Sequence, residues 1–152
     1  MAASSPWEPL AQDVSLLPVL RQLVECHTLF ERAASRLVET QGLTLPQFDV
    51  LVTLGDLPGG LTTKEVGEQS LTTKGSLLPI LDRLEARGLV HRRKGEKDSR
   101  QTIVALTAEG QALYEHAFTA HLAAMCPKLD VLSSAEQTVL VRLLQQLKTA
   151  FQ

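Results

Sequence analysis

The sequence is poor in aromatic residues and has no long apolar run, and both shortages exclude classes of protein. Aromatic residues occupy 4% of the 152 positions, which argues against a protein that stacks single-stranded bases on its rings. No apolar run approaches the roughly 18 residues of a membrane-spanning helix, so we expect no membrane partner. With 44% apolar and 21% charged residues, the composition is that of an ordinary globular protein.

Cysteine is scarce, and the sequence lacks the short motifs of common enzymes. Cys26 and Cys126 are widely separated, which fits neither a disulfide framework nor a zinc knuckle. Residues 1–12 do not resemble a secretory signal, so a reducing cytoplasm is the expected compartment. HExxH, GxSxG, P-loop and Rossmann glycine motifs are missing. We therefore expect neither an enzyme nor a protein with a resident metal or cofactor.

The formal net charge of −2 conceals an uneven distribution of charged residues. Between Thr62 and Arg100 there are nine Lys/Arg and six Asp/Glu, a local charge of +3, whereas the rest of the chain carries −5. The basic excess is greatest in residues 92–100. A solvated charged loop is one interpretation, but a basic region on an acidic chain also indicates a surface that meets a polyanion.

Apolar periodicity predicts long helices towards both ends of the chain. Residues 18–42 carry apolar side chains at helical spacing over an unusually wide arc and end at a glycine. Residues 107–125 form another long helix, and Pro127 is expected to lie beyond its end. Ser133 begins a capping box that starts the last helix. The apolar face of that helix consists of Val139, Leu140, Leu143, Leu144 and Leu147.

Between these regions the pattern predicts a helix–turn–helix. A helix over residues 44–54 precedes a short helix through Gln69, which Thr62 and Glu65 start as a capping box. The next helix ends at Gly88. Its inward side chains are predicted to be Leu77, Leu81 and Leu84.

The hydrophobic period then changes to that of a β-hairpin. Residues 89–94 and 101–106 are rich in β-forming residues and flank a polar turn. We therefore predict a mainly α-helical fold with a small β-hairpin wing, the winged helix–turn–helix. A helix about 10–12 Å across fits a DNA major groove about 12 Å wide, and a basic hairpin can reach phosphates or the minor groove. A winged helix used as a protein-interaction module is the alternative, and the basic hairpin argues against it.

Four motifs in this region resemble those of MarR-type transcriptional regulators. Residues 43–51 are similar to the family's LTxxQfxvL helix, and residues 84–90 to its LExxGLV exit from the recognition helix. Residues 97–100 resemble the D-x-R of the wing, and residues 106–110 the LTxxG entry to the next helix. The resemblance implies a homodimer that binds a pseudo-palindromic operator in double-stranded DNA and acts as a transcriptional repressor.

The resemblance also divides the chain into regions with separate roles. Residues 1–17 are expected to be a flexible lead. Residues 18–42 and 107–152 would form a helical dimerisation region, and residues 43–106 the winged helix–turn–helix DNA-binding domain.

The predicted DNA contacts lie on the short helix, on the recognition helix opposite its leucines, and on the wing. Lys74 lies in a first helical turn, whose free N–H groups favour a phosphate. Arg100 is expected to be aimed by Asp98, although an ordinary surface ion pair is the alternative. The predicted set is Thr63, Lys64, Thr73, Lys74, Ser76, Arg83, Arg92, Arg93, Lys94, Lys97, Asp98 and Arg100.

The family resemblance implies release from DNA by a small phenolic or lipophilic effector, for which no motif marks a pocket. Two alternatives remain open. Cys26 and Cys126 resemble, by position, the cysteines of peroxide-sensing relatives, although the surrounding residues differ and buried structural cysteines are commoner. A metal site would instead use a set whose two histidines are five residues apart, which does not place them on one helix face. That set is Cys26, Glu115, His116 and His121.

Overall fold

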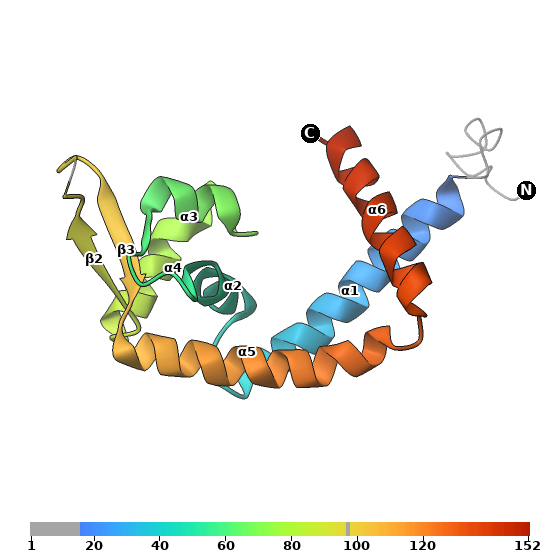
Figure 1. The fold of residues 1–152 in the computed structure, drawn as a ribbon, viewed down its shortest axis with the longest axis horizontal. Helices are drawn as coiled ribbons and strands as arrows, with labels where there is room; N and C mark the ends of the chain where they lie inside the picture. Colours follow the sequence, from blue (N-terminus) through green and yellow to red (C-terminus); the bar gives the residue numbers. More distant parts are fainter. Residues whose placement is uncertain (1–15, 97) are drawn as a thin grey trace, which may run out of the picture.

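The computed structural model describes residues 16–96 and 98–152, which form a helical chain with a small sheet at one end (Figure 1). The elements are α1 (Leu17–Glu39), α2 (Leu45–Leu54), β1 (Leu61–Thr62), α3 (Thr63–Gln69), α4 (Lys74–Ala86), β2 (Val90–Lys94), β3 (Thr102–Leu106), α5 (Ala108–Leu129) and α6 (Ser134–Ala150). The predicted fold class, mainly α-helical with a β-hairpin wing, is confirmed. Most of the predicted lead lies outside the described residues, and Leu17 already belongs to α1.

The sheet contains the predicted hairpin and one additional strand. Its order is β1–β3–β2, with antiparallel neighbours. In the hairpin, Val90 lies opposite Leu106 and Lys94 opposite Thr102. On the other side of β3, Leu61 of β1 pairs with Val104. A strand of two residues is too short to show an alternating pattern in the sequence, which is why it was not predicted.

Glycines end α1 and α4 as predicted. After α1, the Leu43 N–H donates to the Val38 carbonyl at 3.1 Å, and Gly42 between them has a φ of +69°. After α4, the Leu89 N–H donates to the Leu84 carbonyl at 2.9 Å, around Gly88 at a φ of +70°. These hydrogen bonds span one residue more than the bonds inside an α-helix, and they satisfy carbonyls at the helix end. They need a residue in the left-handed region, where glycine has no Cβ penalty.

Side-chain caps start most of the helices. The Thr62 hydroxyl accepts from the Glu65 N–H at 3.1 Å, and the Glu65 carboxylate accepts from the Thr62 N–H at 2.8 Å. The Thr62 hydroxyl also donates to the Glu65 carboxylate, at 2.7 Å. This bond, together with the one from the Thr62 N–H, holds the pKa of Glu65 below its usual range. Ser133 forms the other predicted capping box, at α6, and Thr44 forms a further one at α2. Local hydrogen bonds therefore set these boundaries, which makes them readable from the sequence.

The predicted end of α5 near Met125 is wrong. The helix continues to Leu129 and contains Pro127. Proline lacks the N–H that would bond four residues back, but its fixed φ is compatible with a helix. In the last turn the helix loses little more than that single bond, so it continues until the turn before α6.

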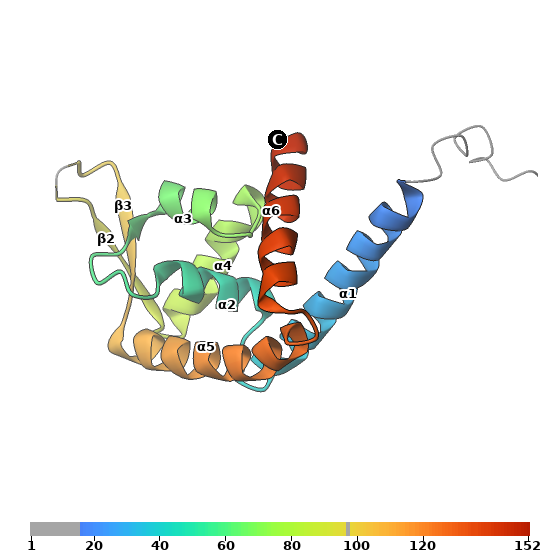
Figure 2. The same ribbon diagram turned by 45° about the vertical axis from the view of Figure 1, so that its right-hand side comes forward.

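A single core fills the lobe made by α2, α3, α4, the sheet and the N-terminal part of α5 (Figure 2). The end of α1 also packs on this lobe. The fully buried side chains include Val38, Val50, Leu51, Leu54, Val66, Leu81, Leu84, Val90 and Val104.

The wing and the start of α1 lie at opposite ends of the molecule (Figures 1 and 2). Among the described residues of α1 only Ala34 and Val38 are buried within the single chain, and α6 has no buried residue. Each described helix is too short or too polar to span a bilayer. The outer helices therefore leave a large apolar surface uncovered, including Val19, Leu20, Val24, Leu29, Phe30, Leu140, Val141, Leu143, Leu144 and Leu147.

Candidate nucleic-acid interface

A side chain from α2 holds the turn between α3 and α4. The Asp49 carboxylate accepts from the Leu71 N–H at 2.8 Å and from the Thr72 hydroxyl at 3.3 Å. Burial raises the pKa of Asp49, and the hydrogen bonds from Leu71 and Thr72 oppose that shift. Asp49 thus fixes the path of the chain into α4. This role is not visible in the sequence, because the partners lie 22 and 23 residues away along the chain.

Helix α4, the predicted recognition helix, has one apolar and one polar face. Leu77, Leu81 and Leu84 are 4%, 0% and 0% exposed, which confirms the predicted inward face. Ser76 and Arg83 are exposed. Because the apolar face is buried in the lobe, the polar face is the one available to a partner.

The first turn of α4 carries two further predicted contacts. Thr73 is the exposed N-cap residue, and its hydroxyl lies 2.9 Å from that of Ser76. Lys74 is the first residue of the helix. Pro79, also in α4, is exposed; the bond that it removes would involve a carbonyl in this first turn, where the helix begins.

A groove of about 420 Å³ lies between the start of α3, α4 and the tip of the wing. Lys64 and Arg100 are the charged residues that line it, and both are cationic. The Thr63 hydroxyl donates to the Thr102 carbonyl of β3 at 3.4 Å, which connects α3 to the wing. The complete lining is Thr62, Thr63, Lys64, Leu78, Arg100, Gln101 and Thr102.

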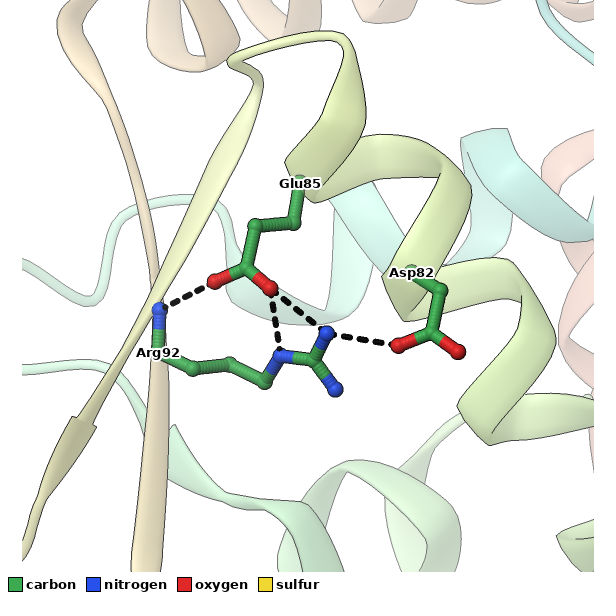
Figure 3. Close-up of polar contacts among 3 residues, drawn as sticks. All are labelled: Asp82, Glu85 and Arg92. Carbon is green, nitrogen blue, oxygen red and sulfur yellow. Dashed lines mark hydrogen bonds and ion pairs between the residues drawn. The ribbon is translucent and has the colours of Figure 1, made fainter.

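The side chain of Arg92, in strand β2 of the wing, extends towards α4 (Figure 3). Its Nη2 donates to Asp82 Oδ1 at 2.6 Å, and its Nε donates to Glu85 Oε2 at 2.9 Å. Its backbone N–H also donates to Glu85 Oε1, at 3.1 Å. These bonds hold the pKa of Glu85 below its usual range and raise that of Arg92. Since its guanidinium is committed to two carboxylates, Arg92 is a positioning residue for the wing, and its predicted phosphate contact stays a prediction.

The other wing cations that the structure describes are more accessible. Arg93 donates to the Gly59 carbonyl at 3.2 Å and to Glu96 at 3.3 Å, which ties β2 to the loop before β1. Lys94 is exposed at the end of β2. Lys97 lies outside the described residues.

Asp98 and Arg100 make the contact expected from their spacing. The Asp98 Oδ1 accepts from the Arg100 N–H at 3.0 Å and from the Arg100 Nε at 3.2 Å. The Arg100 side chain remains 90% exposed, against 36% for Asp98. The carboxylate therefore restrains one edge of the guanidinium and leaves the rest of it free to bind.

Comparison with known proteins assigns this arrangement to a family. The sequence profile of the MarR family matches residues 41–101. The transcriptional regulator HosA of Escherichia coli O157:H7 is 34% identical over 128 residues, which cover 84% of this chain and 90% of HosA. The chain belongs to the MarR family of transcriptional regulators.

Two other proteins are similar to this chain. The organic hydroperoxide resistance transcriptional regulator of Bacillus subtilis (strain 168) is 37% identical over 81 residues, which cover 53% of this chain. The match spans about half of that relative's own length, 54%. The structure of NadR in complex with 4-hydroxyphenylacetate has a TM-score of 0.71 and 27% identity, and it covers 85% of this chain and 91% of NadR.

The structure explains the MarR-type LTxxG motif at the start of α5. The Thr107 hydroxyl accepts from the Gly110 N–H at 3.0 Å and donates to the Gly88 carbonyl at 2.6 Å. The Thr107 N–H donates to the Leu89 carbonyl at 3.1 Å. Gly110 packs so closely that a side chain there would overlap the backbone of Leu89. One short segment therefore joins the end of α4, the wing and α5.

The structure also places the residues of the thiol and metal alternatives. Cys26 and Cys126 are both exposed on the single chain, not buried as structural cysteines commonly are. Within residues 16–96 and 98–152, no three histidine, cysteine or acidic side chains are close enough to hold a metal ion. The metal alternative therefore has no support in the part of the chain that the structure describes.

His121 of α5 lies among aromatic side chains near α2, a position that the sequence did not predict. The His121 ring of α5 lies 5.1 Å from that of Phe48 and 6.4 Å from that of Phe30. Its buried Nδ1 has no hydrogen-bond partner among the described residues, and burial lowers the pKa of His121. The ring brings together α1, α2 and α5, the junction between the lobe and the outer helices.

Proposed function

We propose that this MarR-family chain is a sequence-specific regulator that binds double-stranded DNA and represses transcription by occupying an operator. The observation that carries the proposal is that the polar face of α4 and the cationic groove between α3 and the wing belong to one lobe. Residues 43–106 would be the DNA-binding domain. We also propose that the chain works in the cytoplasm and catalyses no reaction, since its relatives are transcriptional regulators.

The charge distribution supports DNA binding through α3, α4 and the wing. The span from Thr62 to Arg100 carries +3, while the rest of the chain carries −5. Lysine and arginine that neutralise phosphates release counterions, which supplies affinity for DNA of any sequence. With α4 in the major groove, the adjacent wing would reach the neighbouring phosphates and minor groove. Side chains on the polar face of α4 would then supply the sequence preference.

The outer helices support a homodimer. In proteins most helical stability comes from the packing of an amphipathic face. Because α6 has no buried residue among those described, its apolar face needs a partner surface. The exposed apolar residues of α1 and α6 provide one on each chain. We propose that residues 18–42 and 107–152 form this two-fold interface. It would present two recognition helices to half-sites about one helical turn apart, roughly 10 base pairs.

We further propose that a small aromatic acid releases the regulator from DNA. NadR, a structural relative at 27% identity, binds 4-hydroxyphenylacetate. The junction around His121 combines two phenylalanine rings with an unpartnered ring nitrogen, which suits a ligand with one aromatic and one polar end. A ligand there would contact both the lobe and the outer helices, and so could change the distance between recognition helices.

Thiol sensing is a second candidate for the signal. It is favoured by the exposure of Cys26 and Cys126 and by the similarity to the hydroperoxide-resistance regulator of Bacillus subtilis. Oxidation of a thiolate by a hydroperoxide would give a sulfenic acid and an alcohol. The two candidates are separable, because only one of them depends on sulfur.

Selection from random duplex DNA tests the function. We expect the chain to enrich a pseudo-palindrome and to bind it more tightly than scrambled DNA at physiological salt. Added 4-hydroxyphenylacetate should weaken this binding in wild type and in a Cys26→Ser, Cys126→Ser double variant alike. Release by an organic hydroperoxide in wild type alone would support thiol sensing instead. Failure to enrich any duplex would overturn the proposed function.

Substitutions in the wing test whether the orientation of Arg100, and not only the net charge, determines DNA affinity. We expect Arg100→Ala to weaken operator binding about tenfold or more, and Lys97→Ala, which removes the same charge, to weaken it only a few-fold. Asp98→Ala should also weaken binding, because the Asp98 carboxylate restrains the Arg100 guanidinium at 3.2 Å and so reduces the entropy lost on binding. The measurement is titration of labelled duplex at fixed salt.

The sign of the Asp98 effect separates the two explanations. Asp98→Ala raises the net charge of the wing by one, so a diffuse basic patch would bind more tightly after the change. Tighter binding by Asp98→Ala than by wild type would therefore contradict the orientation of Arg100 by its neighbour.

A further inference from the structure

Leu78 is an exposed apolar side chain on a helix face that is otherwise polar. It is 54% exposed, whereas Leu77, Leu81 and Leu84 of the same helix are 4%, 0% and 0% exposed. The buried leucines complete the core without it. Single exposed apolar residues are common on protein surfaces, so the position of Leu78 decides whether it matters.

Leu78 lies beside the groups that are placed to bind a DNA strand. It lines the groove of about 420 Å³ together with Lys64 of α3 and Arg100 of the wing, and it is the apolar member of that lining. Among the described residues no acidic side chain lines this groove, so its charge complements a polyanion. Leu78 also lines a second groove of about 290 Å³ alongside α3, with Glu68 among its lining residues.

The chemistry of the DNA surface limits what Leu78 can contact there. Phosphates are charged, and base edges in the major groove present hydrogen-bond donors and acceptors, with the exception of the C5 methyl group of thymine. A leucine that approaches a base edge loses water favourably against that methyl group and unfavourably against the polar edges. Leu78 is in the N-terminal half of α4, five residues after Thr73, where recognition helices of this kind meet base edges.

We propose that Leu78 is a specificity-determining residue, which packs against the C5 methyl group of a thymine in each half-site. The inference rests on the proposed function and deepens it by naming one base and one atom that α4 recognises. Lys64 and Arg100 hold the strand by its phosphates, and Leu78 reads a methyl group on the adjacent base edge. The sequence placed Leu78 neither among the inward leucines of this helix nor among the expected DNA contacts, because its apolar side chain matched neither pattern.

The test removes one methyl group at a time. Each thymine of the selected operator is replaced in turn by deoxyuridine, which keeps the hydrogen-bonding edge and lacks only the methyl group. We expect one replacement per half-site to weaken wild-type binding about threefold to tenfold, the effect of losing one buried methyl group. Leu78→Ala should bind the original operator more weakly by a similar factor. It should bind the original and the uracil-substituted operator equally.

Leu71→Ala is the matched control. Leu71 is also an exposed leucine of this lobe, at 93%, but it precedes α4 and lines neither groove. Leu71→Ala should lose as much affinity as wild type does when the thymine is replaced by deoxyuridine. Thermal unfolding followed by circular dichroism should show that both variants fold, since neither removes a buried side chain.

The outcomes distinguish this inference from the function on which it rests. Suppose the chain binds an operator, but Leu78→Ala loses as much affinity as wild type at every uracil substitution. The thymine contact is then wrong, while the proposed regulatory function is unaffected. If Leu78→Ala leaves operator affinity unchanged, the inference also fails, and Leu78 becomes a candidate contact for a protein. If no duplex is enriched at all, both proposals fail.

Discussion

Alanine in place of Gly110 is expected to destabilise the protein by about 3 kcal/mol or more, enough to unfold many domains of this size. A Cβ at this position would overlap the Leu89 carbonyl oxygen and lie 2.8 Å from its carbon. Neither side can move freely, because that oxygen already accepts from the Thr107 N–H at 3.1 Å. The strain would therefore fall on the segment that joins α4, the wing and α5.

Gly75→Ala is the matched control for this substitution. Gly75 lies in the first turn of α4, as Gly110 lies in that of α5, but no described residue beyond its chain neighbours is within 4 Å of a Cβ at Gly75. Alanine is the better helix former by roughly 0.5–1 kcal/mol, so this variant should be as stable as wild type or slightly more so. Urea denaturation compares the three proteins. A Gly110→Ala midpoint equal to that of wild type would show that the contact is not tight.

Leu144→Asp should separate the proposed dimer and reduce operator affinity about a hundredfold. The side chain lies in the apolar stripe of α6 and is 43% exposed in the single chain. A carboxylate buried at a subunit interface without a partner is strongly unfavourable. Each monomer would then bind one half-site alone and lose the effective concentration that the second site gains from the first. Sedimentation at micromolar concentration and titration of labelled operator measure the two effects.

Gln145→Asp is the control for the added charge. Gln145 follows Leu144 in the sequence. Because each residue of a helix is rotated by about 100° from the one before it, Gln145 lies on the side of α6 opposite the apolar stripe. This variant should remain a dimer and bind the operator within a few-fold of wild type. A wild-type mass near 17 kDa, or an unchanged dimer in Leu144→Asp, would refute α6 as part of the interface.

Local patterns accounted for most of the secondary structure. The capping pair of Thr62 and Glu65 starts α3, and Gly88 ends α4, because each signal depends on residues within one or two helical turns. The change from helical to alternating period placed the hairpin at β2 and β3 for the same reason. The Asp98–Arg100 contact was also predictable, since only two positions separate its members.

The sequence by itself therefore determined the helices, the hairpin, the inward face of α4 and the basic wing, all of which follow from short-range periodicity and charge. Only the tertiary structure decided which of those charges are free and which apolar groups are not core. The sequence predicts Arg92 to be a DNA-binding cation of the wing, yet its guanidinium forms ion pairs with Asp82 and Glu85. Leu78 belongs to no predicted face or contact set, yet it lies exposed beside the cationic groove. A side chain's role depends on partners brought near it by folding, and their distance along the chain hides them from any local pattern.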